Sequence, residues 1–166
     1  MRIRRETPAD IAAVDRLIGR AFDGHPHSDG SEPAIVRRLR KAEALELALV
    51  AEEDGEILGH IAFSPVGFED GSDGWFGLGP LSVEPSHQRQ GIGSSLMLGG
   101  LELMRDDNAA GVVLVGDPKF YTRFGFQSDT DLSMEGVPPE NLLALPFDGD
   151  IPKGQVAFHR AFFGDL

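Results

Sequence analysis

A chain of 166 residues with 41% hydrophobic and 25% charged residues has the size and composition of a globular protein, and we expect a single domain spanning residues 1–166. The net charge of −12 argues against nucleic acid or an anionic membrane as a partner, because binding to either relies on clustered lysine and arginine. The sequence contains no cysteine, which excludes a disulfide framework, a thiolate zinc site and a cysteine nucleophile.

The N-terminal part of the chain predicts two helices joined by a surface loop. The opening MRIRRETPADI lacks the apolar run of a signal peptide, and no later segment approaches a membrane span, so we expect a cytoplasmic protein. Residues 8–22 and 31–44 predict helices, because apolar residues recur at helical spacing in both. Residues 23–30, DGHPHSDG, carry turn formers throughout. We interpret His25 and His27 in this loop as solvated side chains, and we expect no bound metal.

Antiparallel strands are predicted in the middle of the chain. Residues 45–53 and 56–68 predict a β-hairpin around an Asp-Gly turn, and residues 75–84 predict a third strand. His60 lies inside the second strand among apolar residues. We interpret it as a hydrogen-bonded structural histidine.

The stretch 78–104, LGPLSVEPSHQRQGIGSSLMLGGLELM, predicts an apolar strand, a proline turn, a glycine-containing bend and a helix. Gly91 and Gly93 lack the Cβ atoms that would block close approach, so successive backbone amides at the helix start can converge on an anion, and Arg89 adds a positive charge. The spacing fits neither a dinucleotide fingerprint, because Leu96 stands where glycine or alanine is required, nor a P-loop, which needs Gly-Lys-Ser/Thr. We interpret the bend as a pyrophosphate site; the alternative is a tight turn without a ligand.

The rest of the chain predicts one more strand in parallel pairing, followed by an irregular C-terminal part. After a helix over residues 94–105, the apolar run 111–116 predicts a buried central strand, parallel to the strand before the glycine bend. A short helical segment then ends at Phe126. Residues 127–152 are rich in aspartate, proline and glycine, and residues 155–163 predict a last strand.

Two spaced motifs follow one another along the chain. Leu-Ser-Val-Glu-Pro and Gln-x-x-Gly-x-Gly occupy residues 81–93, and Tyr-x-x-x-Gly-Phe occupies residues 121–126. With GLGPL at 77–81 and GDPKFYTRFGF at 116–126, the whole chain resembles the GNAT superfamily of acyl-CoA-dependent N-acetyltransferases, and within it a small bacterial branch. The resemblance implies an α/β fold: a mixed, mostly antiparallel sheet of about six to seven strands, a central parallel pair splayed around the cofactor, and about four flanking helices.

The same resemblance implies an N-acetyltransferase that uses acetyl-CoA as acyl donor and attacks its thioester directly with an amine. In similar proteins the strand before the bend bulges, and backbone groups of Leu81, Ser82 and Val83 would pair here with the pantetheine arm. The Val83 N–H would donate to the thioester carbonyl oxygen. The pyrophosphate would lie on the bend, which comprises Gln88, Arg89, Gln90, Gly91, Ile92, Gly93 and Ser94.

Two residues are candidates for the proton transfers. Tyr121, the single tyrosine of the chain, matches the family position that commonly protonates the departing thiolate; the alternative is a buried tyrosine at a turn. Glu84 stands where some relatives carry a catalytic histidine and could act as general base, directly or through water. Strand alternation places Glu84 on the face opposite Val83, so a water chain or another carboxylate is the alternative. Asp117-Pro118 replaces an asparagine that many relatives carry.

Three functions are compatible with these features. The first is acetyl transfer to a primary amine of a small molecule or protein; the second is a catalytically silent acyl-CoA-binding or regulatory module, against which the retained tyrosine argues. A toxin acting on aminoacyl-tRNA is disfavoured by the charge of −12. A homodimer is common among relatives, but the sequence does not establish one. We expect the acceptor pocket to form from the first two helices, loop 23–30 and segment 127–152, whose acidic residues suit a cationic amine: Asp129, Asp131 and Glu135.

Overall fold

The computed structural model describes residues 1–26 and 28–164. Its helices are α1 (Ile11–Phe22), α2 (Glu32–Lys41), α3 (Ile92–Asp106) and α4 (Pro118–Tyr121). Its strands are β1 (Arg2–Arg5), β2 (Leu47–Glu53), β3 (Glu56–Phe68), β4 (Trp75–Val83), β5 (Gly111–Val115), β6 (Leu132–Ser133), β7 (Leu142–Pro146) and β8 (Gly154–Phe158).

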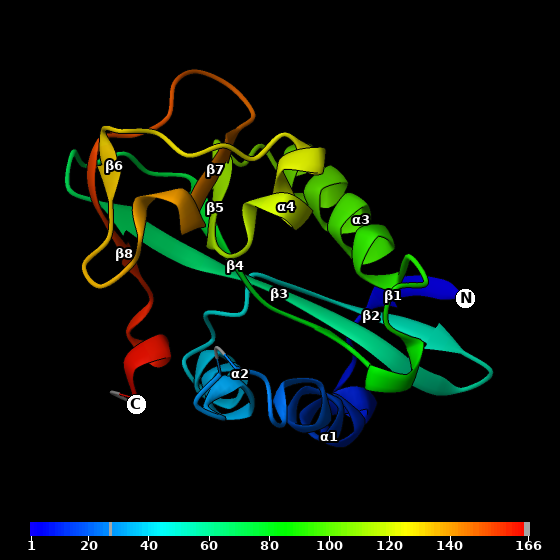
Figure 1. Cartoon of the computed structure of the whole chain (residues 1–166). Helices are drawn as coiled ribbons and strands as arrows, with labels where there is room; N and C mark the ends of the chain where they lie inside the picture. The colour runs from blue at the N-terminus through cyan, green and yellow to red at the C-terminus, as the bar shows by residue number, and fades with distance from the viewer. Residues whose placement is uncertain (27, 165–166) are drawn as a thin grey trace.

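The strands form one mixed sheet with helices on both faces. The order is β1-β2-β3-β4-β5-β7, and β8 pairs with the end of β3 and with β6. Neighbours along this order are antiparallel except β4 and β5, which are parallel and are connected through α3. Figure 1 shows α1 and α2 together on one face of the sheet and α3 on the other. The sheet therefore separates two layers of helices.

The predicted fold class is confirmed, with two differences in detail. The sheet has eight strands rather than six to seven, because β6 adds a two-residue strand that no sequence pattern marks. The predicted last strand is too long, since β8 ends at Phe158 and Arg160–Phe163 form a 3-10 turn. Nδ1 of His159 starts this turn by accepting the N–H of Ala161 at 3.0 Å. Apolar residues continue from β8 into this turn, and for this reason the sequence pattern predicted a single strand.

α3 packs against the sheet through one apolar face. Its buried side chains belong to a cluster that includes Phe63 of β3. A Cβ atom at Gly100 would lie 2.7 Å from the Phe63 ring, so the absence of a side chain there allows helix and strand to approach closely. This contact fixes the height of α3 above the strands. The buried residues of the helix are Ile92, Leu96, Met97, Gly100, Leu101 and Met104.

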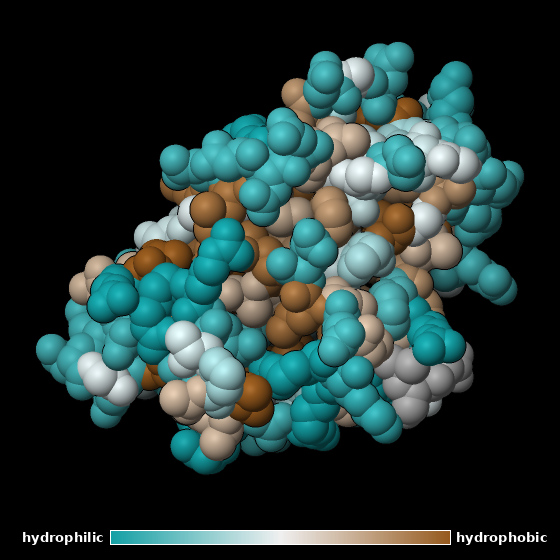
Figure 2. Space-filling view, turned by 180° about the vertical axis from the view of Figure 1, so that it is seen from behind, coloured by the Kyte–Doolittle hydropathy of each residue, from teal (hydrophilic) through white to brown (hydrophobic). Residues whose placement is uncertain are grey.

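One face of the molecule is mostly hydrophilic. In the face seen in Figure 2, hydrophilic residues surround a group of apolar side chains that gathers in the middle. Within the part of the chain that the structure describes, no helix is both long and apolar enough to cross a bilayer.

The start of α1 is tied to β1 by an ion pair. Nη1 and Nη2 of Arg4 donate to the two oxygens of Asp10 at 2.8 and 2.9 Å. The carboxylate also accepts the N–H and the hydroxyl of Thr7 at 2.8 and 3.0 Å. These bonds, led by the one from Arg4, hold the pKa of the Asp10 carboxyl well below its usual range although burial opposes this.

We expect Asp10→Asn to reduce the acid sensitivity of the fold. Because the unfolded state binds the Asp10 proton at a higher pH than the folded state, the stability from this carboxylate is present above pH ~4 and lost as pH falls below it, by about 2 kcal/mol between pH 5 and pH 2. Urea unfolding at both pH values measures the difference. The exposed Glu102→Gln variant is the control, and an equal pH dependence in parent and Asp10→Asn would contradict the assignment.

Candidate active site

The two central strands separate after a short paired stretch. β4 and β5 are paired from Trp75 to Gly77, opposite Gly111 to Val113. Beyond this point β4 pairs only with β3, and β5 pairs only with β7. We call residues 78–83 of β4 the open edge, because no strand among the described residues pairs with their side facing β5. The register between β3 and β4 also shifts in this region, which confirms the bulge implied by the resemblance.

Backbone groups of the open edge point toward the space beside β5. The N–H of Glu84 donates to the carbonyl of Leu58 in β3 at 2.8 Å. Because successive residues of a strand direct their N–H and C=O groups to opposite sides, those of Val83 point away from β3. The side chain of Gln88 agrees with this, since its Nε2 donates to the Val83 carbonyl at 3.3 Å. The Val83 amide is thus available to a ligand at the open edge.

The start of α3 presents free amides. The chain passes through left-handed conformations at Arg89, with φ 64°, and at Gly91, with φ 86°, before the helix begins. The first helical hydrogen bond runs from the Ser95 N–H to the Gly91 carbonyl at 3.0 Å. The amides of Ile92 to Ser94 precede it, and no described residue accepts from them. With the positive end of a 15-residue helix behind them, these amides can bind an anion.

Gly93 faces the open edge without being needed for packing. A Cβ atom there would lie 3.7 Å from side-chain atoms of Phe120 and Val83 and 4.0 Å from Leu81, all ordinary contact distances. The protein itself would therefore tolerate a side chain at this position. A ligand bound close to the amides would clash with such a side chain. Glycine at this position is therefore explained by a ligand and not by packing within the protein.

Tyr121 lies on α4, directly after the end of β5. Its ring packs against Gly116 so closely that a Cβ atom on Gly116 would overlap it. The rings of Phe120 and Phe126 contact it edge-on, with centroids 4.9 and 6.1 Å away. Burial, with a smaller contribution from the negative charge of Asp117, raises the pKa of Tyr121 to about 12. The phenol is therefore neutral at physiological pH and suited to donate a proton.

Glu84 is held by an arginine from the opposite layer. Arg20, in the last turn of α1, donates from Nε to both carboxylate oxygens at 3.2 and 3.1 Å and from Nη2 to Oε2 at 2.7 Å. Leu81 and Val83 pack in the α3 cluster, so Glu84 lies on the other face, as strand alternation predicts. Both oxygens of this carboxylate are engaged by the guanidinium, so neither is without a partner in this arrangement. Its role as general base stays a prediction that this ion pair does not favour.

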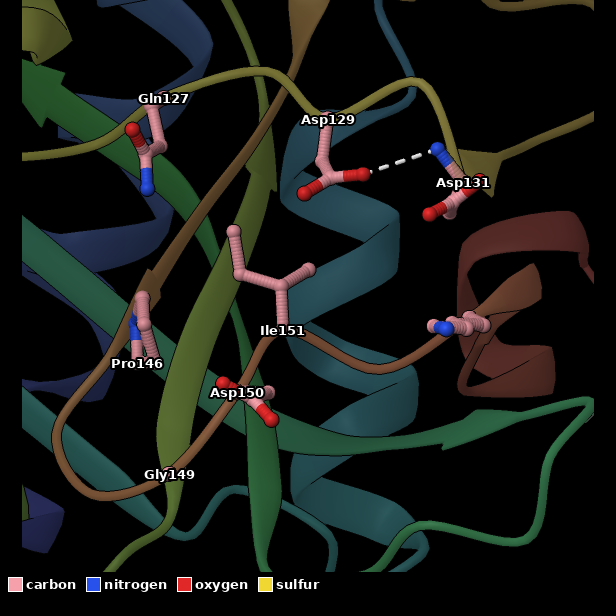
Figure 3. A pocket seen from close by; sticks show the side chains of 8 residues that line it. Gln127, Asp129, Asp131, Pro146, Gly149, Asp150 and Ile151 are labelled. Atoms are coloured by element: carbon pink, nitrogen blue, oxygen red, sulfur yellow. Dashed lines mark hydrogen bonds between the residues drawn. The ribbon is translucent and has the colours of Figure 1, made fainter.

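Two surface hollows of about 430 Å³ each lie in loop regions. Figure 3 shows one of them, where Asp129 accepts the Asp131 N–H at 2.8 Å. It is also lined by Pro146, which pairs with Gly111 at the start of β5. Tyr121 follows the other end of β5, about 13 Å along the strand. These two aspartates, which the sequence analysis assigned to the acceptor pocket, line a hollow that also includes Gln127, the residue after Phe126, and their role at the acceptor stays a prediction.

The second hollow lies between the end of α1 and the start of α2. It includes loop residues from the stretch 23–30 that we expected beside the acceptor. Gly19, which precedes the Arg20 bound to Glu84, also lines it.

His27 lies outside the described residues. Among residues 1–26 and 28–164 no three histidine, aspartate or glutamate side chains are grouped as a metal site would require.

Three residues of the site have roles that the sequence analysis missed. Arg20 binds Glu84 from 64 positions away, and no sequence signal could have indicated this pair. Asn141 forms two hydrogen bonds with Gly116. Its side-chain Nδ2 donates to the Gly116 carbonyl at 3.0 Å, and its backbone carbonyl accepts the Gly116 N–H at 2.9 Å. Phe120 contacts the Gly93 region, and its place beside Tyr121 in the second motif was an available signal.

Comparison with known proteins identifies the family. The model of the acetyltransferase (GNAT) family matches residues 12–126, which contain both strands, the free amides and Tyr121. The chain belongs to the GNAT family. It is therefore an acetyltransferase, and curated relatives are named N-acetyltransferases. YhbS of Escherichia coli K12, described as uncharacterized, is 39% identical over 128 residues, 76% of this chain and 74% of its own.

Solved structures extend the similarity to the whole fold. A GNAT acetyltransferase from Brucella melitensis in complex with acetyl-CoA has a TM-score of 0.87 and 45% identity, over 97% of each chain. YhbS from Escherichia coli in complex with CoA has a TM-score of 0.88 and 32% identity, over 99% of this chain and 93% of its own. The GNAT fold, with its parallel pair parting at the centre, is thus established for this chain.

We expect Gly93→Ala to leave the protein folded and to weaken its affinity for CoA by at least about tenfold, because the new methyl group would separate a phosphate from the amides. Folding stability should stay equal or rise by up to about 1 kcal/mol, since alanine favours helix. Calorimetric titration with CoA and urea unfolding measure the two quantities.

Gly99→Ala is the matched control, because it makes the same change in α3 and its Cβ atom would lie 3.5 Å from Ile3 on the sheet side. It should bind CoA as the parent does. Equal affinity of the Gly93→Ala variant and the parent would show that the phosphate lies elsewhere.

Proposed function

We propose that this acetyltransferase transfers the acetyl group of acetyl-CoA to a primary amine of a small molecule or protein. One observation carries the proposal: the free amides of α3, the open edge of β4 and Phe120 of α4 lie around the same region near Gly93, and the Tyr121 ring contacts that of Phe120. The relatives whose structures contain acetyl-CoA or CoA support it.

The chain's own groups fit the parts of the cofactor. The pyrophosphate would lie on the amides of residues 88–94, with Arg89 as a nearby positive charge. The pantetheine arm would pair with the backbone groups of Leu81 and Val83, while those of Ser82, by the same alternation, face β3; the reactive end would then lie toward the end of β5. Bound acetyl-CoA supplies an activated acetyl group as a thioester. The Val83 N–H, directed away from β3, would polarise its carbonyl.

The transfer requires two proton movements. The neutral amine of the acceptor forms a bond to the carbonyl carbon, and the carbon–sulfur bond breaks. The nitrogen then loses a proton to a base, and the sulfur gains one. Tyr121 is suited to the second step, because its pKa of about 12 keeps the phenol protonated. For the proton that leaves the nitrogen, we propose water or Glu84 as the base.

We expect Tyr121→Phe to lower kcat by about 100-fold or more while CoA affinity changes little, because only the hydroxyl is removed. Thiol release from acetyl-CoA in the presence of a panel of amines measures kcat. The raised pKa keeps the proton on the phenol through the neutral range. The difference in rate between the parent and Tyr121→Phe should therefore not decrease as the pH is raised to ~10. A loss of this difference near pH 8 would exclude Tyr121 as the donor, and so would full activity of the variant.

The same assay tests the alternative of a silent acyl-CoA-binding module. CoA binding without thiol release for any amine in the panel would favour that module over the enzyme. Thiol release that depends on an amine would establish the transfer and identify the acceptor class.

Glu84→Gln and Arg20→Gln separate a catalytic from a structural role of the ion pair. Because the guanidinium occupies both carboxylate oxygens, we expect the two variants to lower kcat by similar factors, each below about tenfold. A loss of about 100-fold in Glu84→Gln alone would instead identify Glu84 as the base. Arg37→Gln, which breaks the exposed pair with Asp15, is the control and should not change kcat.

A further inference from the structure

A chain of buried polar groups lies beneath α1. Nη2 of Arg40, in α2, donates to Oε1 of Glu6 at 2.7 Å, and Nε2 of His60 lies 3.1 Å from the same oxygen. The His60 side chain is completely buried in β3, as expected for a structural histidine. Since a carboxylate only accepts, Nε2 carries a proton in this contact. The contact also fixes the orientation of the ring, so Nδ1 points in one defined direction.

The chain of contacts ends on an unsatisfied atom. Nδ1 of His60 has no hydrogen-bond partner among the described residues, and neither has the hydroxyl of Ser82. Ser82 is only 1% exposed and lies directly opposite His60 in the pairing of β3 with β4. Side chains of directly opposed residues share one face of the sheet, with Cβ atoms about 5 Å apart. A water between such groups would bond to both Nδ1 and the hydroxyl.

Ser82 is the central residue of the part of β4 that most needs positioning. Over residues 78–83 this strand has lost its pairing with β5 and is held by β3 alone. The flanking residues Leu81 and Val83 offer their backbone groups to the pantetheine arm and pack their side chains toward α3. On the other face, the buried Ser82 side chain lies on the same side of the sheet as His60, toward the layer of α1 and α2.

We propose that His60 and Ser82, joined by one buried water, position the open edge of β4 and thereby set the affinity for the pantetheine arm. His60 acts as a positioning residue, because it does not reach the cofactor itself. The water and the hydroxyl can each donate or accept, so the link forms whether His60 is neutral or charged. The inference rests on the proposed function for the identity of the cofactor, but not for the acceptor amine.

The first test compares two buried serines of the same face. Ser82→Ala should weaken CoA binding about tenfold and raise KM for acetyl-CoA equally, with kcat within about twofold. Ser64→Ala is the matched control. Ser64 is also fully buried and without a partner among the described residues, but it lies opposite Gly77, where β4 is still paired with β5. It should bind CoA within about twofold of the parent.

The second test separates the two ends of the His60 ring. His60→Gln can replace Nε2 and keep the contact to Glu6, but it loses the group that faces Ser82; His60→Asn keeps a polar group near Nδ1 and loses the contact to Glu6. We expect His60→Gln to weaken CoA binding as Ser82→Ala does, and His60→Asn to weaken it less. The double variant Ser82→Ala/His60→Gln should bind no more weakly than either single variant, because both break one link.

Titration calorimetry with CoA, in the absence of any amine, is the measurement, with urea unfolding to confirm that each variant is folded. Equal affinity of the Ser82→Ala and Ser64→Ala variants, or additive losses in the double variant, would overturn the inference. If the parent itself failed to bind CoA, the proposed function would fail first. The two failures are therefore distinguishable.

Discussion

The separation of β4 from β5 is the constraint on which the rest of the site depends. Two parallel strands that remain paired satisfy each other's backbone groups and leave nothing for a ligand. Here the pairing stops after three residue pairs, and the bulge in β4 turns the remaining part of the strand away. The freed N–H and C=O groups need a partner. An extended, amide-containing arm is a suitable one.

The two faces of the sheet carry different kinds of groups. On the α3 side are the free amides of the first turn of α3 and the aromatic residues of α4. On the α1 side are the ion pair of Glu84 and the buried contacts of His60, which fit a role in holding β4. β4 takes part in both, since its alternate side chains face alternate layers. Changes in either layer are therefore felt by the one strand that both share.

Most of the fold could be predicted from local patterns, because helices and strands repeat their apolar residues at characteristic periods. The glycine bend was also predictable from local sequence, because Gly91 supplies a left-handed conformation and Gly93 supplies the space that an anion site needs. The partner of Glu84 was not, because a contact between α1 and the end of β4 depends on the packing of whole elements. Whether the hollow of Asp129 and Asp131 receives the acceptor stays a prediction, because composition does not indicate which substrate a loop contacts.

The ion pair between Arg20 and Glu84 also restricts motion. α1 is bonded near its beginning through Asp10 to Arg4 and at its end through Arg20 to the residue after the open edge. A helix held at both ends cannot tilt without carrying the strand with it. A displacement of the end of α1 would therefore be transmitted to the end of β4 through this ion pair.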